Sequence, residues 1–313
     1  MIDAERPARD SLAFQRPPLG GRWRVRGRDL SLDRPLVMGI LNVTPDSFSD
    51  GGQFVDPAQA VEQAARMLGE GADIIDVGGE STRPQGATPV SASEERQRVV
   101  PVIRELLARF PDAVVSVDTV KADVAEAALD AGAPIVNDVS GFRLDPRMAE
   151  LCSRANCGVV LMHSRGGVSD MATFAHARYV DVVDAILHEL RASLDVALAA
   201  GIDREGIALD PGIGFAKRGE HSLAAIAGIG RVAALGYPVL LGASRKRFIG
   251  EISGVKDPAA RVHGTVGANV AGLMLGARIF RVHDVAANRQ ALDVAWAVVQ
   301  QRSKESEESK GSK

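Results

Sequence analysis

The sequence predicts an α/β fold, a (β/α)8 TIM barrel of eight parallel strands preceded by a short N-terminal β-hairpin. Eight short apolar runs each end in a polar or glycine-rich cluster, and each is followed by a stretch with helical periodicity. Together they span about 250 residues, the usual size of such a barrel. The runs with their polar ends are 37–42, 74–82, 114–119, 135–138, 158–163, 207–212, 238–246 and 277–284.

An open, doubly wound sheet would show the same alternation of strands and helices. Its ligand site would lie at one switch point, whereas here residues able to do chemistry follow nearly every strand. We therefore prefer the barrel, and we interpret the strand ends as the mouth of one pocket.

Helices are predicted between the strands from their apolar faces and end signals. Residues 56–72 begin with Asp56 as an N-cap candidate and Pro57 at the first helical position, both typical of helix starts. Similar apolar faces mark 93–110, 121–132, 145–155, 176–201, 223–236 and 285–301. Crossovers of this kind are what parallel strands require.

The two ends of the chain are expected to lie outside a single domain of residues 21–302. Residues 1–20 are rich in Pro and Arg, and residues 303–313 form a short charged tail, compositions that favour disorder. Residues 21–35 alternate apolar and polar side chains around Gly27, which predicts a β-hairpin that could close the bottom of the barrel.

Composition narrows the class of protein. Charged residues make up 25% of the 313 and the net charge is -3, which argues against a nucleic-acid partner. No apolar run approaches the roughly 20 residues of a membrane span, and the N-terminal segment lacks the apolar core of a secretory signal. A cytoplasmic protein with no membrane partner is expected. Cys152 and Cys157 have no neighbour at metal spacing and are expected to be unpaired and structural.

The first two strand ends lead into long polar loops. Asn42 ends the first strand, where its oxygen could face a cation, although a solvated turn is an equal alternative for this loop. The second loop combines two glycines with Ser81, Thr82 and Arg83. Small residues let the backbone approach a ligand, and hydroxyl and guanidinium groups suit phosphate or carboxylate. This loop is therefore interpreted as half of an anion site.

Acids and an amide follow strands three, four and six: Asp118, Asn137, Asp138 and Asp210. Inward-facing carboxylates can accept paired hydrogen bonds from the ring N–H and amino groups of a flat nitrogen heterocycle, and Asn can both donate and accept. A metal-binding carboxylate cluster is the competing interpretation. Helix capping alone would explain Asp138.

The last two strand ends are basic. Ser244, Arg245 and Lys246 follow strand seven, and Arg281 and His283 follow strand eight. Lysine presents a compact charge to phosphate or a ring carbonyl, and arginine can also stack on an aromatic ring. Loops after strands seven and eight are the usual phosphate-binding place in such barrels.

In chain order, the motifs LNVTPDSFSDGG, DVGGESTRP, SVDT, ND, DPGIGF, GASRK and RVH resemble those of the dihydropteroate synthases, pterin-binding enzymes of folate biosynthesis. The resemblance extends from about residue 35 to residue 299. It implies a transferase in which 4-aminobenzoate attacks the methylene of 6-hydroxymethyl-7,8-dihydropterin pyrophosphate, giving 7,8-dihydropteroate and pyrophosphate. It also implies a sulfonamide target and a homodimer, for which the apolar face of 258–275 with 285–301 could serve.

The resemblance distributes the strand-end residues among three subsites and a catalytic set. The catalytic set is Asp118, Asp210, Lys246 and Arg281. The pterin subsite has Met162 and Phe215 as walls and Arg281 stacking on the ring, and comprises Asp118, Asn137, Met162, Asp210, Phe215, Gly242, Lys246 and Arg281. The pyrophosphate subsite is Asn42, Thr82, Arg281 and His283, and the 4-aminobenzoate subsite is Thr82, Arg83, Pro84, Phe215, Ser244 and Lys246.

The resemblance also implies Mg2+ as cofactor, bridging the pyrophosphate oxygens and Asn42. Mg2+ usually binds through few protein groups besides water and substrate phosphates, so no ligand cage is expected. In this family ionisation is expected first, in an SN1-like order, so that the acids stabilise a pterin cation before the amine attacks.

Two departures from the family pattern lie beside the pocket. STRPQGATP contains Gln85 where the family commonly has STRPGA, and the fifth strand ends MHSRGG where MHMQG is frequent. Both departures bear on 4-aminobenzoate binding and on the sulfonamide response. The alternatives are a non-catalytic pterin-binding paralogue and a corrinoid-linked methyltransferase domain, which has no need for the SRK and RVH groups.

Overall fold

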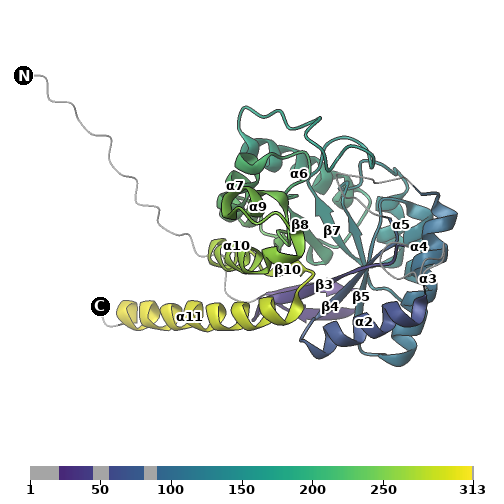
Figure 1. The fold of residues 1–313 in the computed structure, drawn as a ribbon, viewed down its shortest axis with the longest axis horizontal. Coiled ribbons are helices and arrows are strands. Elements are labelled where there is room, and N and C mark those ends of the chain that lie inside the picture. Colours follow the sequence, from purple (N-terminus) through teal and green to yellow (C-terminus); the bar gives the residue numbers. More distant parts are fainter. Residues whose placement is uncertain (1–20, 45–55, 81–89, 312–313) are drawn as a thin grey trace, which may run out of the picture.

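The computed structural model describes residues 21–44, 56–80 and 90–311, with side chains to residue 301. Parallel strands stand at the centre and helices surround them (Figure 1). Their order is β8-β7-β6-β5-β4-β3-β10-β9. The strands are β3 (Leu36–Asn42), β4 (Ile74–Gly78), β5 (Val114–Asp118), β6 (Ile135–Asp138), β7 (Gly158–Met162), β8 (Ile207–Asp210), β9 (Leu240–Leu241) and β10 (Ile279–Val282).

The sheet closes between its two edge strands. Leu209 of β8 forms a parallel bridge with Val239, and its N–H donates to the carbonyl of Pro238 at 2.9 Å, just before β9. The predicted (β/α)8 barrel is confirmed, as is the position of all eight strands. Strand seven is shorter than the predicted 238–246, because a turn follows Leu241 in which the Lys246 N–H donates to the Ala243 carbonyl at 3.2 Å.

The strand register brings the predicted site residues to one rim. Asn42 lies beside Gly78, Gly78 beside Asp118, and Asp118 beside Asn137. Because neighbouring strands are parallel and end at the same level, residues far apart in the chain become neighbours at the mouth. The interpretation of the strand ends as a single pocket follows from this register.

Most of the helices agree with the predicted segments. Asp56 caps the first, accepting from the Ala58 N–H at 2.9 Å. The helix predicted at 176–201 begins at residue 182, because Asp181 caps it there, and the helix predicted at 223–236 breaks at Gly228. The helices are α2 (Pro57–Gly69), α3 (Ala92–Arg109), α4 (Ala122–Asp130), α5 (Met148–Ala155), α6 (Val182–Ala199), α7 (Gly219–Ala227), α8 (Ile229–Ala233), α9 (Arg247–Ser253), α10 (Val262–Leu275) and α11 (Val285–Gly311), with short 3-10 turns at Arg204–Gly206 and Pro258–Arg261.

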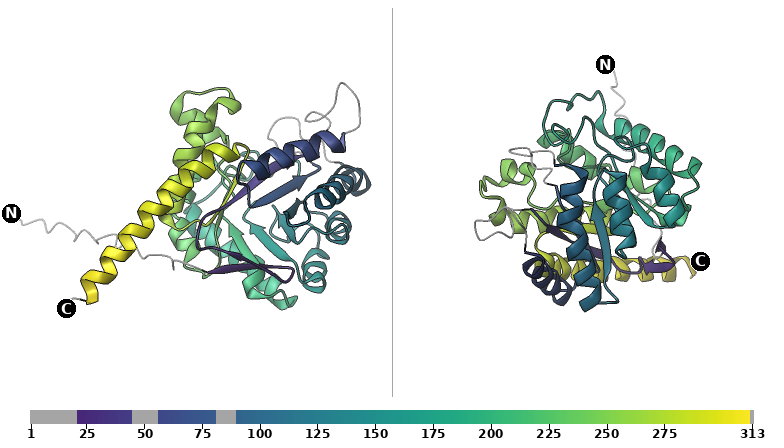
Figure 2. Two further views of the ribbon diagram at one scale, coloured as in Figure 1. Left: turned by 90° about the horizontal axis from the view of Figure 1, so that it is seen from below. Right: turned by 90° about the vertical axis from the view of Figure 1, so that its right-hand side faces the viewer.

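The last helix runs further than the sequence predicts. It continues to Gly311, whereas order is expected to end near residue 302, and it projects beyond the barrel (Figure 2). Glu and Lys, which dominate this tail, are good helix formers, and a helix already nucleated on the barrel extends at little cost. The predicted extension 1–20 lies outside the described residues. No helix in the described part of the chain is long and apolar enough to cross a membrane.

The predicted N-terminal hairpin closes the bottom of the barrel. Its strands β1 (Arg22–Val25) and β2 (Arg28–Ser31) pair antiparallel. Trp23 is fully buried, and its Nε1 donates to the carbonyl of Gly206 at 2.9 Å. It belongs to an apolar cluster to which every barrel strand contributes: Met38, Ile74, Val114, Ile135, Val160, Ala208, Leu240 and Ile279. The hairpin therefore acts as a plug of the barrel interior.

Replacement of the plug residue is expected to destabilise the whole barrel. Trp23→Ala should lower the free energy of unfolding by about 3–5 kcal/mol, because a large buried side chain is lost and a cavity is left. Trp23→Phe keeps most of the volume but leaves the Gly206 carbonyl without its donor, so it should cost less. Guanidinium denaturation followed by circular dichroism measures both. A loss below about 1 kcal/mol for Trp23→Ala would contradict the role of the plug.

Candidate active site

An arginine bridges two acids inside the mouth of the barrel. The guanidinium of Arg281 donates through Nε to Asp76 at 2.6 Å and through Nη2 to Asp118 at 2.6 Å. The same Asp76 oxygen accepts from the side-chain amide of Asn137 at 3.0 Å. The sequence places Arg281 with the basic strand ends, but its side chain lies among the acids. Strands β4, β5, β6 and β10 are thus linked by one polar network.

Burial and charge act in opposite directions in this network. Burial raises the pKa of Asp118 to about 7, although Arg281 opposes the shift, and Asp76 raises it further. Burial alone would lower the pKa of Arg281, but Asp76 and Asp118 raise it above its ordinary value. The guanidinium therefore stays charged, and Asp118 is poised to gain or lose a proton near neutral pH.

The other two predicted acids have different surroundings. Asp210 ends β8, and its Oδ1 accepts from the Gly212 N–H at 2.6 Å; burial raises its pKa to about 6, although Lys246 lowers it. Asp138 is used by its own turn, accepting from the N–H and hydroxyl of Ser140, both at 2.7 Å. A local structural role therefore explains Asp138, whereas the second carboxylate oxygen of Asp210 remains for the pocket.

The amine of Lys246 lies over an aromatic wall. Its Nζ is 4.1 Å from the ring centroid of Phe215, and burial lowers its pKa to about 8. Phe215 and Met162 belong to an apolar cluster at the mouth that includes Met171. Gly242 adjoins the same space, because a Cβ placed there would lie 3.7 Å from the Oδ2 of Asp210. Acids, an amine and a flat apolar wall thus surround one volume.

A histidine that follows the eighth strand pairs with Ser244. The Ser244 hydroxyl oxygen accepts from the backbone N–H of His283 at 3.1 Å and lies 2.9 Å from the ring Nδ1. The hydroxyl can donate to Nδ1 or accept from it, according to the tautomer of the ring. Burial, with Arg245 nearby, lowers the pKa of His283 to about 3, so the ring is neutral. Arg245 itself is held by both oxygens of Asp284, at 3.0 and 2.5 Å.

Several residues that the sequence assigns to the site lie outside the described residues. Thr82, Arg83, Pro84 and Gln85 belong to the segment 81–89, which is outside the described residues. Asn42 is half-buried at the end of β3. The competing interpretation of the acids is a metal-binding cluster. Among the described residues there is no group of three or more His, Cys, Asp or Glu side chains that could hold a metal ion.

Sequence reasoning missed Asp76. It is fully buried within β4 and anchors both Arg281 and Asn137. The available signal was a charged residue inside the apolar run IIDVGG, where a carboxylate requires a partner.

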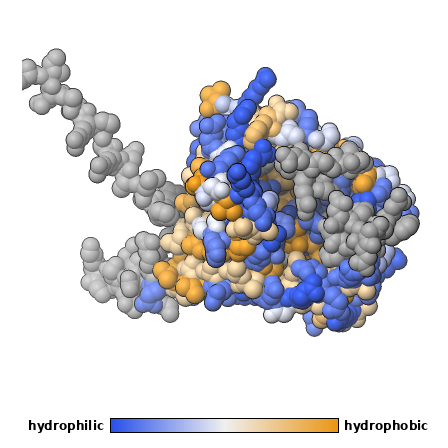
Figure 3. Space-filling view, viewed as in Figure 1, coloured by the Kyte–Doolittle hydropathy of each residue, from blue (hydrophilic) through white to orange (hydrophobic). Residues whose placement is uncertain are grey.

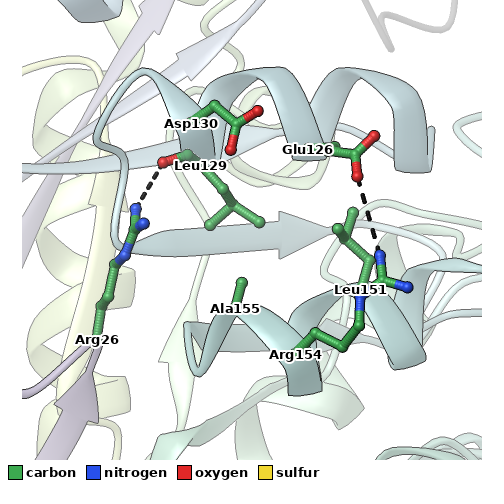
Figure 4. Close-up of a pocket in the computed structure, with 7 residues that line it drawn as sticks. All are labelled: Arg26, Glu126, Leu129, Asp130, Leu151, Arg154 and Ala155. Atoms are coloured by element: carbon green, nitrogen blue, oxygen red, sulfur yellow. Dashed lines mark hydrogen bonds and ion pairs between the residues drawn. The ribbon is translucent and has the colours of Figure 1, made fainter.

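An open pocket of about 220 Å³ lies away from the mouth (Figure 4). The hairpin turn, α4 and α5 line it, with Leu129 and Leu151 in its wall. Arg26 donates to the Leu129 carbonyl at 2.5 Å, and Arg154 pairs with Glu126 at 3.9 Å. Both arginines are engaged within the wall, so the strand ends remain the candidate active site.

The fold and pocket define a (β/α)8 barrel enzyme whose mouth combines acids, an amine and an apolar wall, groups that suit a flat heterocycle. Residues 38–283 match the family model described as pterin binding enzyme. The dihydropteroate synthase of Mycobacterium leprae is 46% identical over 273 residues, which cover 86% of this chain and 95% of that protein. The solved dihydropteroate synthase of Xanthomonas albilineans with 4-aminobenzoic acid is 45% identical to this chain. The match covers 90% of this chain and 98% of the solved chain, and the two superpose with a TM-score of 0.82. The chain belongs to the pterin-binding enzyme family, and within it to the dihydropteroate synthases, which are transferases.

The charges of Asp210 and Lys246 are expected to set the pH range of activity. Because the pKa of Asp210 is raised to about 6 and that of Lys246 is lowered to about 8, both are charged between these values. The ratio kcat/KM should therefore fall below about pH 6 as Asp210 gains a proton, and above about pH 8 as Lys246 loses one. A requirement for ionised Asp118 would move the acid limb toward its pKa of about 7.

Initial rates across this pH range measure both limbs. In Lys246→Arg the side chain stays protonated, so the alkaline limb should move upward while the acid limb stays in place. A wild-type profile that is flat through both pKa values would contradict these assignments.

Proposed function

We propose that this chain joins 4-aminobenzoate to 6-hydroxymethyl-7,8-dihydropterin pyrophosphate in the cytoplasm, releasing pyrophosphate and 7,8-dihydropteroate. Solved dihydropteroate synthases of Thermus thermophilus with 4-aminobenzoate and of Xanthomonas albilineans with 7,8-dihydropteroate support this choice. The observation that carries it is the meeting of Asp118, Asn137, Asp210 and Lys246 at one mouth, with Phe215 as wall.

The pterin is proposed to bind edge-on to the acids and face-on to the wall. The carboxylate of Asp210 can accept two hydrogen bonds from the ring N–H and amino group, and Asn137 can both donate and accept. Lys246 faces the ring carbonyl, and Phe215 and Met162 bury one face. Together these groups fix the plane of the ring and expose its methylene.

The network of Asp76, Asp118 and Arg281 suits a cationic intermediate. It already holds one planar cation, the guanidinium of Arg281, against two carboxylates. A pterin whose leaving group departs first becomes a planar cation too, and preorganised carboxylates stabilise such charge without reorganising. In this proposal Arg281 leaves the acids to stack on the pterin and to contact pyrophosphate.

The pyrophosphate is proposed to lie beside Asn42 and His283, with Thr82 and Arg281 completing the subsite. In the tautomer that carries its proton on Nε2, the neutral His283 would offer an N–H, and Asn42 offers one neutral oxygen at the end of β3. This donor set fits Mg2+, which is commonly carried on substrate phosphates with few protein ligands. When bound, Mg2+ would neutralise negative charge on the leaving group.

The second substrate is proposed to bind beside Phe215, Ser244 and Lys246, with Thr82, Arg83 and Pro84. Its aniline nitrogen attacks the methylene: a C–N bond forms, the C–O bond to pyrophosphate breaks, and the nitrogen loses one proton to solvent. A sulfonamide should compete for this position, as the solved Yersinia pestis dihydropteroate synthase with a sulfonamide drug supports.

The assignment is tested with purified protein, both substrates and Mg2+. The wild type should form dihydropteroate and pyrophosphate, and a sulfonamide should inhibit competitively against 4-aminobenzoate. Asp210→Ala and Lys246→Ala should each lower kcat/KM by about a hundredfold or more, because each removes a charge from a water-poor site. Lys256→Ala, which changes an exposed lysine, is the control.

Wild-type rates in either site variant would overturn the residue roles. Binding of pterin without product formation by the wild type would instead identify the non-catalytic paralogue.

We also propose a homodimer through α10 and α11. Apolar residues gather over these helices (Figure 3), and Val294 and Val298 are 65% and 54% exposed. Light scattering should give twice the 33.0 kDa of the chain. Val294→Asp with Val298→Asp should give monomers, because charge buried at an apolar interface is unfavourable, whereas Leu144→Asp, an exposed residue elsewhere, should not. A monomeric wild type would contradict the proposal.

A further inference from the structure

We propose that Lys217 is a positioning residue, whose buried ammonium group holds the turn Gly212–Ala216, with its three residues of positive φ, and thereby sets the places of Asp210, Phe215 and Lys246. This inference rests on the proposed pterin roles of those three residues. It concerns a lysine that does not itself face the substrate.

The ammonium of Lys217 has a partner for each of its protons. The side chain is almost fully buried, with 1% of its surface exposed. Its Nζ lies 3.0 Å from the carbonyl of Gly212, 3.1 Å from the carbonyl of Phe215, and 2.8 Å from Nδ1 of His163. A lysine carries three protons and no acceptor, so this set satisfies it. Two of the three bonds draw together carbonyls of the same short segment.

That segment has a backbone conformation that needs such support. Gly212, Gly214 and Ala216 have φ angles of +68°, +78° and +47°. Glycine adopts this region readily, but an alanine does so only at a steric cost, and such residues persist where their surroundings hold them. A Cβ at Gly212 would lie 1.9 Å from the His163 carbonyl oxygen, so no larger residue fits there. The lysine is the only cation that a hydrogen bond links to these carbonyls among the described residues.

The segment touches each of the three pterin-subsite residues named above. The N–H of Gly212 donates to Asp210 at 2.6 Å. The ring of Phe215 lies beneath the amine of Lys246 at 4.1 Å. A Cβ at Gly214 would lie 3.1 Å from Cδ of Lys246, so the backbone there lies against that side chain. A shift of this segment would therefore move the acid edge, the wall and the amine together.

Glu189 balances the positive charge of Lys217 through the ring of His163. Burial lowers the pKa of Lys217 to about 7. In its ammonium form Lys217 donates to Nδ1 of His163, and the ring proton then lies on Nε2, which is 3.1 Å from Oε2 of Glu189. Burial, with Lys217 nearby, lowers the pKa of His163 to about 4, so the imidazole is a neutral link between the cation and Glu189. Arg165 pairs with Glu189 in turn, at 2.5 Å. The network ends at the surface, away from the substrate.

The variant Lys217→Met tests this proposal, because methionine keeps the apolar stem and removes the three donors. With the probe 6-hydroxymethyl-7,8-dihydropterin pyrophosphate and Mg2+, calorimetry should show about tenfold weaker binding or more. The acid limb of the pH profile should also move upward, since Lys217 lowers the pKa of Asp210 and that effect is lost. The limb reports the charge of Lys217 near Asp210, and the loss of affinity reports the positioning of the segment.

Two further variants separate positioning from general stability. Ser222→Ala removes a buried hydroxyl of α7 that donates to the Arg218 carbonyl at 3.0 Å, and it should leave affinity and acid limb at wild-type values. Lys217→Met with Ala216→Gly should regain part of the lost affinity, because glycine adopts the positive φ without the lysine.

Binding by Lys217→Met within about threefold of the wild type would overturn the inference, whatever the position of the acid limb. If Lys217→Met does not fold, the binding assay and the pH profile are measured with Lys217→Gln instead. The binding assay omits 4-aminobenzoate, so a wild type that binds the pterin but makes no product would refute the proposed reaction and leave this inference standing.

Discussion

Closure of the sheet between β8 and β9 is the constraint on which the pocket depends. Asp210 ends one of these strands, and the turn after the other leads to Lys246, so the bridge between Leu209 and Val239 brings an acid and an amine together. An open sheet would leave them at opposite edges. The hairpin secures the same closure from below, because Trp23 packs against a layer to which every strand contributes.

The closed barrel buries several charged side chains, and these side chains pair with one another. Asp76 and Asp118 lie in the low-dielectric interior, where an unpaired carboxylate is costly, and Arg281 reaches across to both. Asp210 has Lys246 and Lys217 nearby, and each lowers its pKa against the effect of burial. Two carboxylates thus share Arg281, and Asp210 has two lysines nearby.

The fold and the membership of the pocket could be predicted from sequence because both depend on local patterns. Apolar runs with polar ends give the strands, and in a parallel barrel all such ends meet at one rim. What failed depends on tertiary contacts. The direction of Arg281 is decided by Asp76, which an apolar run conceals, and the break at Gly228 lies within a continuous apolar pattern. Lys217 lies just after the motif DPGIGF, but its role depends on the carbonyls of Gly212 and Phe215, which only the folded loop brings together.

The same pairing of charges supports the proposal that Mg2+ accompanies the pyrophosphate. Pyrophosphate adds several negative charges, but His283 is neutral, Arg245 is held by Asp284, and Arg281 is shared by two acids. At the end of β3, Asn42 offers only a dipole. If Arg281 turns to the leaving group, it uncovers two carboxylates just as positive charge develops on the pterin. In the proposed reaction these carboxylates would stabilise the pterin cation, and a bound Mg2+ would neutralise charge on the pyrophosphate that the paired cations of the protein do not.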